Sequence, residues 1–239
     1  PPFNTGATQR RTTLRTVADP DGDRIGFQGR RYRSEVQGQI SYNDQYDDYL
    51  AFLKPRLIEM QRLLNKAGSL YLHLDSREVH YVKVALDGIF GRDCFLNELV
   101  WAYDYGARSK RRWPTKHDNI LVYAKDPKRY RFDAEAVDRI PNMAPGLVGK
   151  EKAARGKLPT DTRWHTIVPT LGGERTGYPT QKPLVLLDRI LRASANPGDL
   201  VVDPFNGSGT TGLAALKLGM RYVGIDREEE YLALTRARV

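Results

Sequence analysis

A short segment near the C-terminal end of the chain places the tightest constraint on the fold. Residues 203–211, with the sequence DPFNGSGTT, follow the apolar run 200–202 and precede a helix-forming stretch. Gly207 and Gly209 have no Cβ atom, so the backbone there can turn sharply and approach a ligand closely. The helix that follows offers backbone N–H groups without intrahelical partners. Strand, glycine-rich turn and helix in this order predict a ligand site at the carboxyl edge of a parallel sheet.

A second acidic residue indicates the kind of ligand. Asp226 ends the next predicted strand and lies 23 positions after Asp203. In nucleoside-binding α/β proteins, an acidic residue about 20 residues beyond the turn accepts the ribose hydroxyls. The turn lacks the Gly-x-Gly-x-x-Gly pattern of a pyrophosphate site and the Gly-Lys-Ser/Thr of a triphosphate site. An adenosine-containing ligand without phosphates fits better, and S-adenosylmethionine is such a molecule.

Strands and helices alternate along much of the chain. The alternation predicts an α/β fold with a mostly parallel, twisted sheet that carries helices on both faces. We expect one domain over residues 1–239. Apolar periodicity predicts helices over about 44–66, 77–90, 184–195, 210–218 and from 228, and strands over 70–75, 97–103, 119–124, 200–202 and 222–225.

Two segments show little apolar periodicity. Residues 7–43 are rich in Arg, Gly, Asp and Gln, which predicts a mobile or ligand-ordered loop rather than core. Residues 126–169 are rich in charged residues, Gly and Pro. This composition predicts an inserted subdomain, an extended surface arm or simply a long loop.

Charge indicates the partner. Lys and Arg outnumber Asp and Glu by 38 to 29, giving a net charge of +9. Such a surface suits a polyanion, and nucleic acid is the leading partner. Several basic clusters carry an aromatic neighbour, and we predict DNA contacts for the cluster Lys110, Arg111, Arg112 and Trp113.

Other site classes receive little support from the composition. Cys94 is the single cysteine, so no intrachain disulfide can form. The four histidines are scattered without partner cysteines, so we expect no metal site. No apolar run approaches the ~18 residues needed to span a bilayer. We expect no secretory leader, and we expect a cytoplasmic, nucleoid-associated protein.

Three motifs together identify a family resemblance. The chain begins with the run PPFNTG at residues 1–6, continues with YPTQKP at residues 178–183, and then reaches the turn at 203–211. These motifs in this order resemble the β-class DNA amino-methyltransferases, which methylate N6 of adenine or N4 of cytosine with S-adenosylmethionine. The resemblance implies a circularly permuted Rossmann-like methyltransferase fold with an inserted target-recognition segment.

The resemblance also implies roles for particular residues. Pro1, Pro2 and Phe3 would be catalytic and face the target base, while Thr180 and Lys182 would lie near the methionine portion of the cofactor. Asp226 would hold the ribose. The remaining residues implied to bind the cofactor form its loop: Asp203, Phe205, Asn206, Gly207, Ser208, Gly209, Thr210 and Thr211.

The same resemblance divides the chain into three parts. Residues 1–130 would form the catalytic half, 131–168 the target-recognition segment and 169–239 the cofactor-binding half. The run Leu72-His73-Leu74-Asp75 either lines the catalytic cleft or is a strand end with one satisfied polar group. Family members are often dimers, so a homodimer is possible.

The chemistry explains why these residue types are needed. An exocyclic amino nitrogen is a poor nucleophile because its lone pair is delocalised into the ring. In the family, the amino group donates two hydrogen bonds. One goes to the side chain of the residue before the first proline, and the other goes to the carbonyl of that proline, here Pro1. The base must also be flipped out of the duplex, and Phe3 would stack on it. The residue before Pro1 lies outside this sequence, and we expect it to be an Asp that ends an upstream strand.

Three alternatives stay open beside the adenine reading. The run NTG at residues 4–6 and the run YPTQKP favour adenine, but methylation of cytosine N4 is the first alternative. The second is a catalytically silent S-adenosylmethionine-binding subunit that recognises DNA. A nicotinamide dehydrogenase is disfavoured by the missing pyrophosphate fingerprint.

Overall fold

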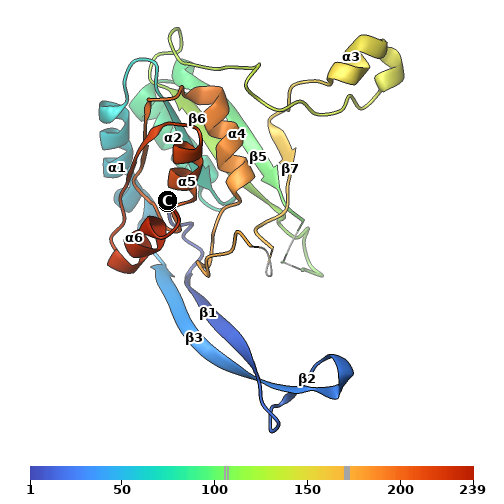
Figure 1. The fold of residues 1–239 in the computed structure, drawn as a ribbon. Coiled ribbons are helices and arrows are strands. Elements are labelled where there is room, and N and C mark those ends of the chain that lie inside the picture. Colours follow the sequence, from blue (N-terminus) through green and yellow to red (C-terminus); the bar gives the residue numbers. More distant parts are fainter. Residues whose placement is uncertain (105, 107, 170–172) are drawn as a thin grey trace.

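The computed structural model describes residues 1–104, 106, 108–169 and 173–239, and Figure 1 shows the arrangement of its elements. The strands are β1 Ala7–Ala18, β2 Arg24–Ile25, β3 Arg31–Asp44, β4 Ser69–Leu74, β5 Phe95–Ala102, β6 His117–Ala124, β7 Thr162–Trp164, β8 Leu200–Asp203 and β9 Arg221–Gly224. The α-helices are α1 Tyr49–Leu63, α2 Val79–Phe90, α3 Lys150–Arg155, α4 Leu184–Ser194, α5 Thr210–Lys217 and α6 Glu229–Arg236.

The expected mostly parallel sheet is instead mixed. One sheet has the order β4-β6-β5-β7, in which β6 runs antiparallel to both β4 and β5 while β7 runs parallel to β5. Strands β8 and β9 form a separate parallel pair. The apolar sequence of β6 does not encode its direction, because a strand buried on both faces has the same composition in either orientation. The prediction of an α/β fold is confirmed, while the directions of the strands and their division between sheets differ from it.

Helices cover both faces of the four-stranded sheet, as expected. On one face, α1 and α2 bury Leu53, Leu86 and their neighbours against β4 and β6. On the other face, Ile190 and Leu186 of α4 pack against β5 and β6. Successive side chains of β6 point to opposite faces. Leu121 therefore belongs to the first core, and Ile120 belongs to the second.

A third core joins α4 to the glycine-rich part of the chain. Leu191 of α4 packs with Ala214 and Ala215 of α5 and with Met220, which precedes β9. The helix α4 therefore lies between the four-stranded sheet on one side and α5 on the other (Figure 1). This packing places the turn at 203–211 beside the central sheet.

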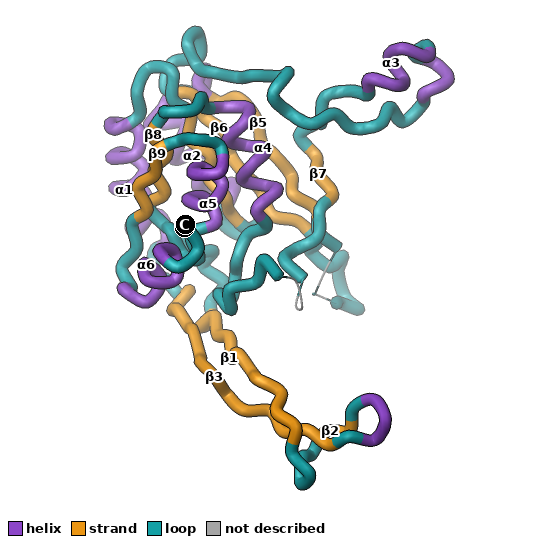
Figure 2. The backbone as a smooth tube through the Cα atoms, viewed as in Figure 1, coloured by secondary structure: helices purple, strands orange, loops and turns teal. Residues whose placement is uncertain are grey.

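The expectation of a loop over residues 7–43 is wrong. Strands β1 and β3 pair antiparallel from Ala7 opposite Asp44 to Ala18 opposite Tyr32, with a bulge beside Leu14. The hairpin extends away from the body (Figure 2). Because it packs neither face against a core, its sequence has no alternation of apolar and polar residues to mark the strands.

The remaining sequence expectations hold within a few residues. Helix α1 starts at an Asp48 cap, whose carboxylate accepts a hydrogen bond from the Ala51 N–H at 2.8 Å, and it includes Pro55. Gly91 ends α2 with a φ of 89°, as expected of a glycine at this position. The segment 126–169 is mostly irregular, with α3 and β7 as its regular elements. None of the helices that the structure describes is long and apolar enough to cross a bilayer.

The core of α2 gives a stability prediction. Leu86 is fully buried, whereas Val84 on the same helix is 71% exposed. The substitution Leu86→Ala should lower the free energy of unfolding by about 2–5 kcal/mol, because it leaves a cavity. Val84→Ala should change it by less than about 0.5 kcal/mol. Urea titration followed by circular dichroism measures both, and an equal effect of the two substitutions would contradict the assigned core.

Candidate active site

The glycine-rich turn is fastened at both ends by Asp203. This residue ends β8, and its carboxylate accepts hydrogen bonds from the Phe205 N–H at 3.0 Å and the Thr211 hydroxyl at 2.7 Å. Thr211 stands in the first turn of α5. One carboxylate therefore links the two ends of the turn between β8 and α5.

Asn206 anchors the middle of the turn. It is buried, and its side-chain amide donates to the Thr235 hydroxyl of α6 at 2.7 Å and accepts from the Tyr222 hydroxyl of β9 at 2.7 Å. Gly209 has a φ of 70°, and a Cβ atom there would lie 2.4 Å from the Thr235 hydroxyl oxygen. The turn therefore requires glycine at this position on grounds of both conformation and space.

Asp226 lies beside the turn at the end of β9. Its two carboxylate oxygens accept hydrogen bonds from the Gly207 N–H at 2.8 Å and the Glu228 N–H at 3.2 Å. A carboxylate offers about four acceptor positions, and Asp226 is only partly buried. It can therefore hold the turn and still accept hydrogen bonds from a ligand.

The run at 178–183 packs against the turn through Tyr178. A Cβ atom on Gly207 would lie 3.1 Å from the Tyr178 ring, which stacks on Tyr42 with centroids 6.0 Å apart. Burial raises the pKa of Tyr178 and raises that of Tyr42 to about 12. The Tyr42 hydroxyl lies 3.2 Å from the Thr180 hydroxyl. The base of the hairpin thus meets the predicted cofactor residues.

Lys182 turns its side chain toward the first motif. Its Nζ atom lies 4.5 Å from the centroid of the Phe3 ring and 5.7 Å from that of Trp101. Asp118 of β6 is 3.7 Å from the amine. Burial lowers the pKa of Lys182, while the Asp118 carboxylate opposes this effect. The backbone carbonyl of Lys182 accepts a hydrogen bond from the Thr210 hydroxyl at 3.2 Å, which joins this run to the turn.

Asp118 is the centre of a buried polar cluster. Its carboxylate lies 2.9 Å from Nε2 of His73 and accepts a hydrogen bond from the Tyr103 hydroxyl at 3.2 Å. Burial acts to raise the pKa of Asp118, but the hydrogen bond from His73 and the charge of Lys182 outweigh it, so this pKa lies below its usual value. Burial and Lys182 lower the pKa of His73 to about 4. His73 is therefore neutral at pH 7 and donates its Nε2 proton to Asp118.

The first motif is held by a fully buried carboxylate. Asp44, at the end of β3, accepts hydrogen bonds from the Phe3 and Asn4 N–H groups at 2.8 Å and from the Thr5 hydroxyl at 2.6 Å. The Phe3 ring lies 5.4 Å from the His73 ring. The hydroxyl of Tyr49 donates to the Pro2 carbonyl at 2.6 Å.

The structure brings most of the predicted site residues together. Pro1 is partly buried, at the start of the motif that Asp44 holds. The Ser208 hydroxyl lies 3.1 Å from that of Thr210 in the same turn. Phe205 is partly buried and packs on the core of α1, with its ring centroid 6.4 Å from that of Phe52. Of the two interpretations of the run at 72–75, the contacts of His73 fit a position at the site.

Sequence reasoning missed Asp44, Asp118, Trp101 and Tyr103. Asp118 stands in an apolar strand, and a charged residue in a buried strand is the one signal that could have drawn attention to it. Asp44 gives no such signal, because it borders a segment that reads as a loop.

The predicted basic DNA cluster lies in the connection between β5 and β6. Lys110, Arg111 and Arg112 are exposed, and Trp113 is 94% exposed. The Ser109 hydroxyl accepts hydrogen bonds from two of their backbone N–H groups. Residues 170–172, which fall in the predicted cofactor-binding half, lie outside the described residues.

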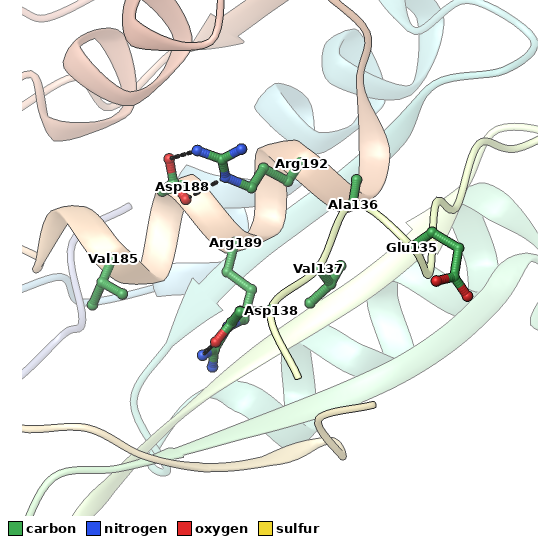
Figure 3. A pocket seen from close by; sticks show the side chains of 8 residues that line it. All are labelled: Glu135, Ala136, Val137, Asp138, Val185, Asp188, Arg189 and Arg192. Atoms are coloured by element: carbon green, nitrogen blue, oxygen red, sulfur yellow. Dashed lines mark hydrogen bonds and ion pairs between the residues drawn. The ribbon is translucent and has the colours of Figure 1, made fainter. Parts of the chain in front are cut away.

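A hollow of about 480 Å³ lies elsewhere, between residues 135–138 and α4 (Figure 3). Asp138 forms an ion pair with Arg189, and Asp188 forms one with Arg192 at 2.7 Å. These charges are compensated in pairs. We therefore interpret the hollow as a packing gap between the irregular segment and α4, and not as a binding site. Within the described residues, no three His, Cys, Asp or Glu side chains gather as metal ligands.

The lowered pKa of His73 predicts a pH dependence of stability. A histidine whose folded pKa lies near 4, against 6.5 when unfolded, stabilises the fold above pH 6.5 and loses that contribution as the pH falls toward 4. Between pH 7 and 5 the loss should be about 2 kcal/mol. The variant His73→Gln should lose less over this interval. His80→Gln, which removes an exposed imidazole, should behave as the wild type, and urea titrations at both pH values test the comparison.

Known proteins resemble this chain in sequence and in fold. The family model for N6 and N4 DNA methylases matches residues 1–237. The type II methyltransferase M.HpaI of Haemophilus parainfluenzae is 31% identical over 202 residues, which cover 84% of this chain and 63% of that protein. The DNA adenine methyltransferase YhdJ of Escherichia coli K12 is 31% identical over 206 residues, covering 81% and 67%. The chain thus spans about two thirds of the length of these relatives.

A solved structure shows the same fold. The crystal structure of the M1.HpyAVI–SAM complex superposes with a TM-score of 0.61 at 24% identity, covering 81% of this chain and 84% of that one. The match of the family model over nearly the whole sequence, together with relatives above 30% identity, shows that the chain belongs to the N6/N4 DNA methylase family.

Proposed function

We propose that this protein transfers a methyl group from S-adenosylmethionine to N6 of adenine in double-stranded DNA. One observation carries the proposal: the PPF run, the TQKP run and the glycine-rich turn meet around Lys182. Its amine lies beside the Phe3 ring, and its carbonyl is bonded to Thr210 of the turn. A base-facing segment and a nucleoside-binding turn that are joined through one residue are what a transfer between two bound molecules requires.

The chemistry of the residues around the turn fits this cofactor. Asp226 keeps acceptor positions for the ribose hydroxyls, and the N-terminus of α5 offers N–H groups to a carboxylate. Lys182 and Thr180 would lie near the methionine portion, with Asp203 close by. When bound, S-adenosylmethionine supplies an electrophilic methyl group. The sequence of the turn has no fingerprint for phosphates, which favours this ligand over a dinucleotide.

The residues of the first motif would orient the base. Tyr49 donates to the carbonyl of Pro2, so the carbonyl of Pro1 is the one we assign to the amino group of the base. Proline has no N–H that could compete for these acceptors. Phe3, whose backbone is fixed by Asp44, would stack on the flipped base. Unstacking the base costs a few kcal/mol, which stacking and phosphate contacts must offset.

The choice of adenine rests on two supports. The relative YhdJ is named as a DNA adenine methyltransferase, and the runs NTG and TQKP resemble adenine enzymes. The family also includes N4 methylases, so methylation of cytosine N4 is the alternative.

The proposal extends to the partners of the chain. Residues 131–168 would be the target-recognition segment, and the cluster at Lys110–Trp113 would contact DNA. We infer a cytoplasmic, nucleoid-associated protein, and a homodimer is compatible with the family resemblance.

The first test is methyl transfer itself. The full natural chain is incubated with labelled S-adenosylmethionine and unmethylated bacterial DNA, and the modified nucleoside is identified by mass spectrometry. We expect N6-methyladenine. N4-methylcytosine would replace the adenine assignment by the cytosine one. Tight cofactor and DNA binding without transfer would instead establish the silent-subunit hypothesis.

The second test concerns the ribose. Asp226→Asn keeps the size of the side chain but removes its charge, so affinity for S-adenosylmethionine should fall about 10- to 100-fold, as expected for hydrogen bonds to a charged group. Glu230→Gln, an exposed change on α6, is the matched control. Titration calorimetry measures both, and an unchanged affinity of the Asp226 variant would remove the ribose assignment.

A further inference from the structure

The hairpin of β1 and β3 is the largest feature that the proposed site leaves unexplained. Its strands of 12 and 14 residues are far longer than the usual 5–6. At about 3.3 Å per residue, β1 spans roughly 40 Å. In Figure 1 the hairpin extends from one end of the body and the segment bearing α3 from the other. An isolated hairpin is marginally stable in water, so a partner bound along an arm of this length would stabilise it.

The hairpin buries almost nothing of its own. Among its described side chains, Leu14 is 49% exposed, Val36 66% and Ile25 71%. The tip is ordered by packing around Tyr32, since a Cβ atom on Gly26 would lie 2.6 Å from its ring. Both faces of the ribbon between tip and base are therefore open to a partner.

The charged residues of the hairpin point to the chemistry of that partner. Residues 7–43 contain seven arginines, four acidic residues and no lysine. Arginine binds phosphates and guanine edges in a bidentate manner that lysine cannot match. The seven are Arg10, Arg11, Arg15, Arg24, Arg30, Arg31 and Arg33.

The three arginines of β1 are available to a polyanion. Arg33 is occupied by Asp19 and Glu35, each at 3.3 Å. By contrast, no ion pair within the described part of the chain involves Arg10, Arg11 or Arg15. Arg10 and Arg11 are neighbours on one strand and therefore point to opposite faces. The ribbon thus presents uncompensated positive charge on both sides.

The base of the hairpin is tied to the candidate active site. Asp44 ends β3 and holds Phe3, Tyr42 lies 3.2 Å from the hydroxyl of Thr180, and the Tyr231 hydroxyl of α6 donates to the Ser41 carbonyl at 2.8 Å. A polyanion bound along the hairpin would therefore reach the residues that would face the target base.

We propose that this hairpin is a DNA-binding arm, and that Arg10, Arg11 and Arg15 contact the phosphates of the duplex beside the target base. A two-stranded ribbon is narrow enough to enter the major groove, and threonine, serine and glutamine side chains between the arginines can donate hydrogen bonds to phosphates or bases. The inference rests on the proposed action on DNA and adds to it a surface distinct from residues 131–168 and from Lys110–Trp113.

The test compares two triple variants of the full chain that lose the same net charge. The first carries Arg10→Gln, Arg11→Gln and Arg15→Gln, and the control carries Lys54→Gln, Lys66→Gln and Arg92→Gln, all exposed on the body. Fluorescence anisotropy measures affinity for a DNA duplex at several salt concentrations. The arm variant should bind about tenfold more weakly or worse, and the slope of log affinity against log salt should fall by about 2 to 3. The control should stay near the wild type.

Further readouts separate the possible failures. Affinity for S-adenosylmethionine and kcat at saturating DNA should not change in the arm variant, while KM for DNA should rise. A wild-type protein that binds no DNA would count against the proposed function as a whole. If the wild type binds DNA and the arm variant binds equally with the same salt slope, the arm proposal alone is wrong. An altered oligomeric state with unchanged DNA binding would instead identify the arm as a contact between two copies.

A crosslinking experiment gives a second measurement that does not depend on the charge change. Thr16 is exposed on β1, and Thr16→Cys labelled with a photoreactive aryl azide should crosslink to the duplex. The unsubstituted chain, whose single cysteine Cys94 is partly buried, is the control. Absence of crosslinks from a variant that binds DNA normally would contradict the proposal.

Discussion

The arrangement of the candidate site depends on one buried carboxylate. Asp44 has no exposed surface, and such a charge is tolerated only where hydrogen bonds replace its hydration. Three successive backbone N–H groups, of Phe3, Asn4 and Thr5, converge on it, and they do so because Asn4 adopts a φ of 54°. Successive N–H groups around an anion form a concave nest. The nest fixes the direction of Phe3 and at the same time ends the hairpin.

Polar and aromatic contacts hold the two halves of the site together. The hydroxyl of Thr210 joins the turn to Lys182, and the rings of Tyr42 and Tyr178 join the hairpin to the TQKP run. The apolar cores lie beside these contacts: α1 packs with α2 in one core, and α4 packs with α5 in another. A site at the junction of separate cores can bind two different molecules, one on each side of Lys182.

Local patterns predicted the turn and its flanking elements, because β8, residues 203–211 and α5 are neighbours in sequence. The hairpin was not predicted for a physical reason. Because both of its faces are open to solvent, its strands need no alternation of apolar and polar residues. That Asp118 meets His73 and Lys182 was not predicted either, for a different reason. His73 and Asp118 are 45 positions apart, and their proximity follows from the antiparallel pairing of β4 with β6, a direction that apolar content does not reveal.

The buried charges of the site orient groups rather than exchange protons. His73 is neutral at pH 7, its Nε2 proton is engaged by Asp118, and a pKa near 4 makes the other ring nitrogen a weak base. Asp118 is in turn engaged by Tyr103 and faces Lys182. This suits a transfer in which the nucleophile is the nitrogen of the substrate itself and the protein must mainly align two bound molecules. A rigid polar cluster behind Phe3 keeps the aromatic surface in place, while binding to DNA can be left to surfaces farther out, where arginines remain solvated and uncompensated.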